Sequence, residues 1–367
     1  NGSRRAVLPA SILAMILCGM SVGLDAQRVA VGSYPDIAVD AGGLVHIVYV
    51  RGDQVLVRSQ SAGGGWSAER EVPVPATMVE RSDPELAVDT VGRLHVFCGA
   101  VYAREEEEGW TTVEVPKAVR DTAMAMDVAG DAYLCFRGGW DGGDLGMIRI
   151  SAGSSAFEKL SDPDIFGGRG KGMSNHVYAH VFAGAKPGEI HVVYRHHEPP
   201  LRCGYRYTSD GGKTWSGGGV ADDDFEAPSG AAAPDGTPYL ITGQGEVFQR
   251  GATAETWTSL GRAVSAGRRD LPAIAVDGTG TVYTACFGGH YNIYRDGTWR
   301  GAGRLPASKG MEVGFAEIAA NPGVGAWIVW EDGPQVSNEL RAGAADIWVA
   351  QLVTDTESPT ANSSDEF

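Results

Sequence analysis

The sequence contains little positive charge, few cysteines and no convincing helical pattern after residue 26. Its 367 residues include 30 lysines and arginines against 46 aspartates and glutamates, which gives a formal net charge of −16. This balance argues against a nucleic-acid partner, because phosphate binding relies on clustered basic side chains. The five cysteines have no spacing typical of metal ligands, so we predict no metal site.

The first 26 residues differ from the rest of the chain. Two arginines precede an apolar stretch that ends just before Ala26, a residue suited to signal cleavage. Pro, Gly and Ser interrupt the stretch, which argues against a membrane span. We therefore interpret residues 1–26 as a secretory signal peptide and expect a secreted protein, extracellular or periplasmic, with no membrane contact after cleavage. Residues 354–367 are polar and acidic, and we expect them to be disordered.

A repeated phrase fills the chain between these two ends. Each copy has an apolar run that usually ends in Asp or Asn, then a Gly turn, then a second apolar run. Residues 36–50, 85–98 and 273–286 are the clearest copies, and looser copies bring the number to seven. A period of roughly 40 to 50 residues with several strands per unit is typical of a β-propeller. We predict an all-β, seven-bladed β-propeller that forms one domain over residues 27–353.

The last unit lacks an outer strand of its own. Its third strand is expected near Asp346 to Val353, and the polar tail follows directly. An unpaired strand edge invites aggregation, so a ring of blades needs a donor strand there. Residues 27–33, which precede the first unit, are the obvious donor. We predict that this N-terminal strand closes the ring, and we expect a monomer.

Three histidines occupy one position of the repeat. His46, His95 and His191 each lie three residues after the turn glycine of their unit. Repeat proteins reuse the same packing solution from unit to unit. We therefore interpret these histidines as structural and expect them to lie within the blades.

Residues that the repeat does not explain gather in loops before the first strand of a unit or after the second. In an up-and-down blade both kinds of loop project to one end of the ring. These loops carry Arg120, Trp140, His176, Arg195, His196, His197, Arg268, Arg269, His290 and Tyr291. Arginine and histidine beside aromatic rings suit a carboxylate-bearing sugar, so we expect an acidic polysaccharide or oligosaccharide partner. The alternative is ordinary solvated loop charge.

The octapeptide T-S-D-G-G-K-T-W spans Thr208 to Trp215. It resembles the Asp box, or bacterial neuraminidase repeat, of the sialidase-like propeller superfamily. That resemblance implies a turn on the outer side of a blade, away from the active site, and so a structural role for Asp210. Sialidase activity itself is not favoured, because the first unit begins G-S-Y-P-D-I-A-V-D, without the arginine of the Phe/Tyr-Arg-Ile-Pro motif.

The fourth unit is similar to polysaccharide lyases of the ulvan-lyase type, which are built on such propellers. In that family two histidines about twenty residues apart act together with Tyr and Arg. Here His196 and His197 follow His176 by 20 and 21 residues. Phe225 and Gln244 stand at the places comparable to the family's Tyr and Arg, so Tyr291 and Arg268 or Arg269 are the candidates to replace them.

This resemblance implies β-elimination on a uronate without a cofactor. Arg195 would neutralise the carboxylate, His176 or His197 would remove the C5 proton, and Tyr291 or the other histidine would protonate the leaving oxygen. Substrate-binding roles are expected for His196, Arg120, Arg268, Arg269, His290 and Trp140. Two alternatives remain open: a non-catalytic glycan- or protein-binding propeller, and a divergent sialidase-like glycoside hydrolase.

Overall fold

The structure is a computed structural model, and nearly all of its regular elements are β-strands. It describes residues 24–61, 63–79, 83–115, 120–137, 145–160, 176–196, 202–217, 219–222, 227–251, 256–263, 271–286, 288–308, 311–320, 322–323, 325–333 and 345–352. Within these ranges there are 27 β-strands and one short helix, α1 (Ala76–Val79). No helix of the described residues is long and apolar enough to cross a membrane.

The strands form five four-stranded antiparallel sheets and one seven-stranded sheet. The four-stranded sheets are β5 (Glu85–Val88), β6 (Leu94–Cys98), β7 (Val101–Glu106), β8 (Gly109–Glu114); β9 (Arg120–Met126), β10 (Ala132–Arg137), β11 (Leu145–Ile150), β12 (Glu158–Lys159); β13 (His176–Ala183), β14 (Ile190–His196), β15 (Arg202–Thr208), β16 (Gly219–Asp222); β17 (Ser229–Ala232), β18 (Pro238–Ile241), β19 (Glu246–Arg250), β20 (Trp257–Arg262); and β21 (Ala273–Val276), β22 (Val282–Ala285), β23 (His290–Arg295), β24 (Thr298–Arg304). The seven-stranded sheet has the order β25 (Glu312–Ala320), β26 (Ala326–Gly333), β27 (Ala345–Leu352), β1 (Gln27–Val39), β2 (Val45–Arg51), β3 (Gln54–Ser59), β4 (Arg70–Val72).

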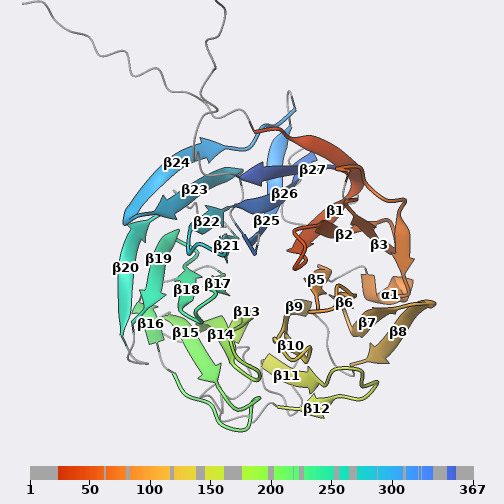
Figure 1. Ribbon diagram of the computed structural model, residues 1–367, viewed down its shortest axis with the longest axis horizontal. Coiled ribbons are helices and arrows are strands. Elements are labelled where there is room, and N and C mark those ends of the chain that lie inside the picture. Colours follow the sequence, from red (N-terminus) through yellow and green to blue (C-terminus); the bar gives the residue numbers. More distant parts are fainter. Residues whose placement is uncertain are drawn as a thin grey trace, which may run out of the picture.

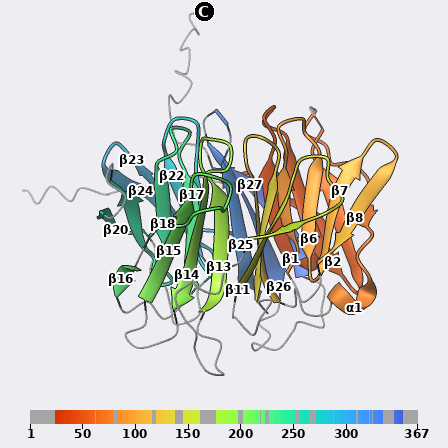
Figure 2. The same cartoon turned by 90° about the horizontal axis from the view of Figure 1, so that it is seen from below.

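The sheets stand side by side around a central axis (Figure 1). The strands nearest the axis, which we call inner strands, are β1, β5, β9, β13, β17, β21 and β25. Seen from the side, the strands run steeply between the two ends of the molecule (Figure 2). Each inner strand pairs with the next strand along the chain, so a hairpin turn at one end of the axis joins them. The inner strands therefore all begin at the opposite end.

Strand β1 belongs to two neighbouring parts of the seven-stranded sheet. Its first half pairs with β27, with Gln27 opposite Val349 and Gly32 opposite Ala345. Its second half pairs with β2, from Ser33 onward. The expected pairing of residues 27–33 beside the last strand is thus present, and it leaves neither β27 nor β2 with a free edge on this side.

Aspartates terminate four of the inner strands and build the hairpin turns. In each turn the Oδ1 atom accepts the backbone N–H groups two and four residues further on, at 2.8 to 3.0 Å. These residues are Asp40, Asp89, Asp127 and Asp277. A carboxylate that accepts local amides stabilises a tight turn, as the repeat predicts. The expected counterpart Asn321 lies outside the described residues.

The three histidines that share one repeat position are buried within the sheets, and that prediction is confirmed. His46, His95 and His191 are 7%, 1% and 0% exposed. Each Nδ1 atom bonds a hydroxyl of the third strand of the same sheet: Ser59 at 2.8 Å, Tyr102 at 2.6 Å and Tyr205 at 2.6 Å. Burial lowers the pKa of His95 to about 4 and that of His191 to about 3, so both rings are neutral near pH 7.

Candidate functional site

A cavity of about 330 Å³ lies at the axis. Its lining comes mainly from the inner strands of all the sheets. It includes Asp83 and Leu271, which precede β5 and β21, and Tyr34, which lies at the irregularity of β1 just before its regular pairing with β2. The cavity therefore reaches the end of the axis where the inner strands begin. That is the same end at which β13 begins with His176 and β14 ends with His196.

One register position supplies most of the polar groups of this cavity. In the second strand of each repeat unit, one residue lies two places after the buried histidine or after the residue at the same repeat position. The register position meant here is the inner-strand residue paired with it, as in Asp36–Val48, Glu85–Phe97 and Glu317–Val329. In chain order this position holds Asp36, Glu85, Ala123, His180, Ser229, Ala273 and Glu317. We call these residues the axial layer. All of them except Ala123 line the cavity.

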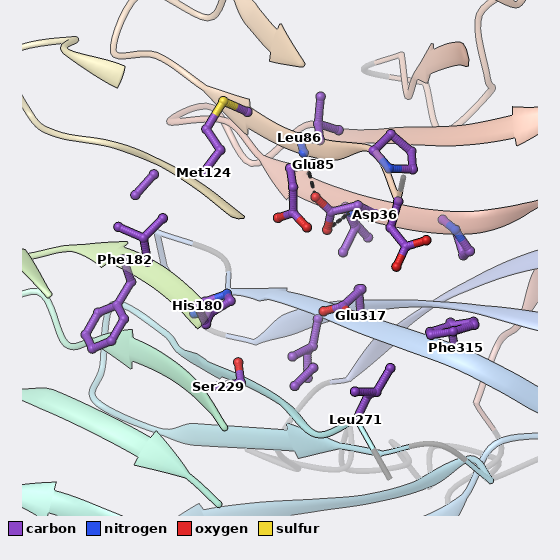
Figure 3. A pocket seen from close by; sticks show the side chains of 18 of the residues that line it. Asp36, Glu85, Leu86, Met124, His180, Phe182, Ser229, Leu271, Phe315 and Glu317 are labelled. Atoms are coloured by element: carbon purple, nitrogen blue, oxygen red, sulfur yellow. Dashed lines mark hydrogen bonds between the residues drawn. The ribbon is translucent and has the colours of Figure 1, made fainter. Parts of the chain in front are cut away.

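The three carboxyl groups of the axial layer come from adjacent inner strands. Strand β1 lies against both β5 and β25. Figure 3 shows the side chains of Asp36, Glu85 and Glu317 directed toward the same space, with His180 on the other side of it. No lysine or arginine occurs among the described residues that line the cavity. Within this described lining, the carboxyl groups therefore face one another without a lysine or arginine beside them.

Two members of the axial layer bind the backbone of the next sheet. Asp36 Oδ2 accepts the N–H of Leu86 at 2.6 Å, and its Oδ1 accepts the N–H of Ile37 at 2.7 Å. His180 Nδ1 accepts the N–H of Gly230 at 3.3 Å. Leu86 and Gly230 occupy equivalent positions, one residue after Glu85 and Ser229. The side chain of one sheet thus satisfies an inner-edge amide of its neighbour, which would otherwise be a costly unpaired donor.

Burial controls the protonation of this layer. Desolvation raises the pKa of Asp36 to about 7, against the opposing effect of the hydrogen bonds from Leu86 and Ile37. It also raises the pKa values of Glu85 and Glu317, and repulsion from the neighbouring carboxylates adds to the rise. Burial lowers the pKa of His180 to about 4. Near neutral pH the cavity is therefore polar but holds much less charge than its residues suggest.

An aromatic pair flanks the carboxyl groups. The rings of Tyr34 and Phe315 lie 5.2 Å apart. Tyr34 has a left-handed φ of 52°, and its N–H donates to Glu331, a fully buried carboxylate at the end of β26. Within the described residues, no group of three His, Cys, Asp or Glu side chains is arranged to hold a metal ion. The chemistry of the cavity is thus that of carboxyl groups, one imidazole and aromatic rings.

The predicted catalytic residues of the fourth unit lie at the end of the β13–β14 pair. His176 is directly opposite His196, and Val177 is opposite Arg195. The Nε atom of Arg195 is buried and has no hydrogen-bond partner within the part of the chain that the structure describes. Arg195 lies two residues after Val193, which packs against Leu240 of the next sheet, so strand alternation directs the arginine to that side.

The other predicted site residues divide into three groups. His197, Trp140, Arg268 and Arg269 lie outside the described residues. Arg120 is the first residue of β9 and is opposite Arg137, and His290 is an exposed residue at the start of β23. Tyr291, by contrast, is only 7% exposed and packs in the core cluster with Ile293 and Leu305.

The ring of Tyr291 packs over a glycine of the neighbouring strand. A Cβ atom added to Gly303 of β24 would come within 2.4 Å of the Tyr291 hydroxyl, so the ring lies directly over that glycine. Burial raises the pKa of the phenol. Tyr291 does not line the axial cavity, and its hydroxyl is poorly placed to protonate a leaving group there.

The octapeptide forms a tight turn held by its aspartate. Asp210 accepts hydrogen bonds from the Thr214 hydroxyl at 2.6 Å, the Thr214 N–H at 2.9 Å and the Lys213 N–H at 3.0 Å. These bonds lower the pKa of Asp210 to about 2, and the bond from the Thr214 hydroxyl has the largest effect. Trp215 packs against the cluster that includes Tyr133 and Leu160. The hydrogen bonds are thus local, and the Trp215 ring packs against residues of the preceding sheet.

Comparison with known proteins gives the fold a name. No protein-family model matches the chain, and no curated protein matches its sequence. Solved structures do match: a PL25 ulvan lyase bound to -[GlcA(1-4)Rha3S]- has a TM-score of 0.55 and 12% identity, over 90% of this chain and 95% of the lyase. A fungal alcohol oxidase of the AA5 family in complex with copper has a TM-score of 0.56 and 11% identity, over 89% of this chain and 75% of the oxidase. The β-propeller domain of Myceliophteria thermophila Cps50 (Swd1) has a TM-score of 0.55 and 11% identity, over 88% of this chain and 98% of that domain.

The protein is a β-propeller. Its sheets are the blades, and the hairpins of the inner strands lie at one end of the propeller axis. At these identities the likeness establishes the fold and carries no activity with it.

Proposed function

We propose that this β-propeller is a secreted, monomeric protein that acts on acidic, uronate-containing polysaccharide by β-elimination. The observation that carries the proposal is the pairing of His176 with His196 at the end of the axis where the inner strands begin, with Arg195 preceding His196 in the chain. A buried guanidinium nitrogen without a partner in the described chain is the group that a substrate carboxylate satisfies best. The fold of the PL25 ulvan lyase supports the same proposal.

The chemistry needs three roles. Arg195 neutralises the uronate carboxylate and so lowers the cost of the carbanion at C5. His176 or His197 removes the C5 proton, and the electron pair forms the C4–C5 double bond as the C4–O bond breaks. The remaining histidine protonates the leaving oxygen, a role for which burial disfavours Tyr291. His196, Arg120, Arg268, Arg269, His290 and Trp140 bind the flanking sugars.

The scaffold that we propose for this site is a ring of seven blades, closed by the N-terminal strand. The pairing of β1 with both β27 and β2 supports the closure. The Asp210 turn, the bacterial neuraminidase repeat of the sialidase-like superfamily in this proposal, lies at the edge of its blade between β15 and β16.

A panel of uronate-containing polysaccharides tests the activity. A lyase produces an unsaturated uronate, which is followed by its ultraviolet absorbance, together with new reducing ends. Appearance of both signals with at least one substrate is the expected result. Binding of a polyuronate without either signal would favour a non-catalytic glycan-binding propeller.

The axial carboxyl groups favour a second candidate, a divergent glycoside hydrolase. Hydrolysis of a glycosidic bond needs one protonated and one ionised carboxyl group on either side of the bond. Asp36 stays ionised more readily than its neighbours because it accepts two amide hydrogen bonds, whereas the pKa of Glu85 is raised well above the usual value. New reducing ends without the unsaturated product would identify this activity.

A further inference from the structure

We propose that Asp36, Glu85 and Glu317 form a proton-dependent latch, which holds the first, second and last inner strands together while protons are shared among them and loosens when the protons leave. The proposal concerns the scaffold; it does not depend on the proposed lyase chemistry, whereas the glycoside-hydrolase candidate would use the same carboxyl groups. It rests on three carboxyl groups at one register position of adjacent strands, facing one cavity of about 330 Å³.

The described groups that line the cavity around the latch include no lysine or arginine to replace the protons. Strand β9 contributes Met124 and Ala125 to the cavity, β17 contributes Ser229 and β21 contributes Ala273. Among the described residues, the remaining titratable groups that face the latch are Tyr34 on β1, Asp83 before β5, and His180 on β13. Glu331 on β26 accepts the N–H of Tyr34 and adds a further carboxyl group close to the cavity. Within the described lining, protonation is therefore the means of relieving repulsion among the carboxylates.

The three groups divide the charge unequally. Asp36 accepts the N–H groups of Leu86 and Ile37, and such bonds favour the ionised form. Neither Glu85 nor Glu317 has a comparable bond to the described backbone, and burial and repulsion raise the pKa values of both. The protons therefore reside mainly on the two glutamates. A protonated carboxyl group can donate a hydrogen bond to a neighbouring carboxylate, whereas two carboxylates can only repel each other.

The direction of the pH effect follows from these pKa values. In the unfolded chain Asp and Glu titrate at about 4. In the folded protein the pKa of Asp36 is raised to about 7 and those of Glu85 and Glu317 are raised as well. Between these limits the three carboxyl groups bind more protons in the folded state than in the unfolded state, so their contribution to stability is greatest at acidic pH and falls as pH rises. Each proton released on unfolding changes the unfolding equilibrium constant by about tenfold per pH unit.

Urea unfolding of the full chain between pH 6.5 and pH 8 tests the latch, because below this range the buried histidines, whose pKa values are lowered, have the opposite effect on stability. We expect the unfolding constant of the wild type to increase by about tenfold or more per pH unit. The double variant Glu85→Gln/Glu317→Gln keeps the shape of the protonated side chains and should lose most of this dependence. The control Glu107→Gln/Glu108→Gln removes the same number of carboxyl groups from exposed positions and should retain it. Equal pH dependence in the latch variant and the wild type would overturn the proposal.

Infrared spectroscopy of the folded wild type gives a second readout that needs no variant. The C=O stretch of a protonated carboxylic acid should be present near neutral pH and should disappear as the pH is raised. Hydrogen exchange at the Leu86 amide, which Asp36 holds, should accelerate over the same range. Absence of the protonated band at pH 6 would also overturn the proposal, because the layer would then be ionised and neutralised by something other than protons.

Discussion

The carboxylate of Asp277 accepts the backbone N–H of Gly325 at 2.9 Å, which connects the turn of one blade to the turn of the next. Asp127 holds the N–H of Gly188 in the same way at 2.8 Å. Both aspartates also hold their own turns through Oδ1. In these two blades one aspartate thus holds both its own turn and the contact with the turn of the next blade.

Replacing Asp277 by alanine should destabilise the protein by about 3 kcal/mol or more, because buried amide and hydroxyl donors lose a charged acceptor. Asp277 is fully buried, and its Oδ2 also accepts the hydroxyl of Tyr283 at 2.9 Å. Asp235→Ala is the matched control, since that exposed aspartate is held by bonds from the nearby Thr237, whose N–H it accepts at 2.8 Å. Urea unfolding should show a loss of about 1 kcal/mol or less for the control. Equal losses would contradict the inter-blade role.

His95 should remain neutral down to about pH 4. The ring is 1% exposed, its Nδ1 lies 2.6 Å from the Tyr102 hydroxyl, and burial lowers its pKa to about 4. The unfolded chain binds a proton at a pKa of about 6.5, so this group makes the folded state less stable as pH falls from about 6.5 toward 4. Nitrogen NMR of the ring should show no titration between pH 5 and pH 8. A midpoint near 6.5 in the folded protein would refute the assignment; the same ring in urea is the reference.

Loss of the Asp210 carboxylate should affect stability and leave chemistry intact. The variant Asp210→Asn keeps one acceptor oxygen but weakens the bonds to Lys213 and Thr214, so we expect a loss of about 1 kcal/mol. The turn joins β15 to β16, at the far end of the β14–β15 pair from His196. Urea unfolding measures the loss. A much larger loss, or none, would show that the turn is held in another way.

The fold could be predicted because every part of the pattern recurs. Asp40 and Asp89 mark the same turn in two units, and His46 and His95 lie at the same later position. An uncertain assignment of a strand or turn in one unit can therefore be corrected from another unit. The pairing of residues 27–33 with β27 also followed from the missing strand of the last unit. These features depend on local turn hydrogen bonds and on the alternation of side chains along strands, and the sequence pattern indicates both.

The axial layer was missed for a physical reason. Asp36, Glu85 and Glu317 each precede the turn residue by four positions in the sequence, but an acidic residue in an otherwise apolar strand gives no sign of which groups will face it. Only the arrangement of the inner strands around the axis brings them into one cavity. Tyr291 was assigned to a loop because the start of β23 at His290 was not recognised. Once that strand begins there, alternation places Tyr291 with Ile293 on the core side.

Removal of residues 1–33 should make the protein aggregate. The truncation deletes the segment that pairs with β27, from Gln27 opposite Val349 to Gly32 opposite Ala345, and so exposes a strand edge. A chain that begins at Gln27 keeps the pairing and should remain soluble and monomeric. Light scattering and size-exclusion chromatography distinguish the two. A soluble, monomeric truncation would show that β27 needs no partner on that edge.

The proposed chemistry should depend on the fourth blade. If the protein is a lyase, His176→Ala and His197→Ala should each reduce turnover by about 10² or more, the usual effect of losing a general acid or base. Arg195→Lys keeps the positive charge but loses the Nε donor, which is buried without a partner in the described chain, and should lower kcat more than it raises KM. Asp210→Asn serves as the control with unchanged turnover, because its bonds are confined to its own turn in the described structure. Full turnover in both histidine variants would remove the proposed mechanism, and loss of turnover in the Glu85→Gln/Glu317→Gln variant alone would transfer the chemistry to the axial carboxyl groups.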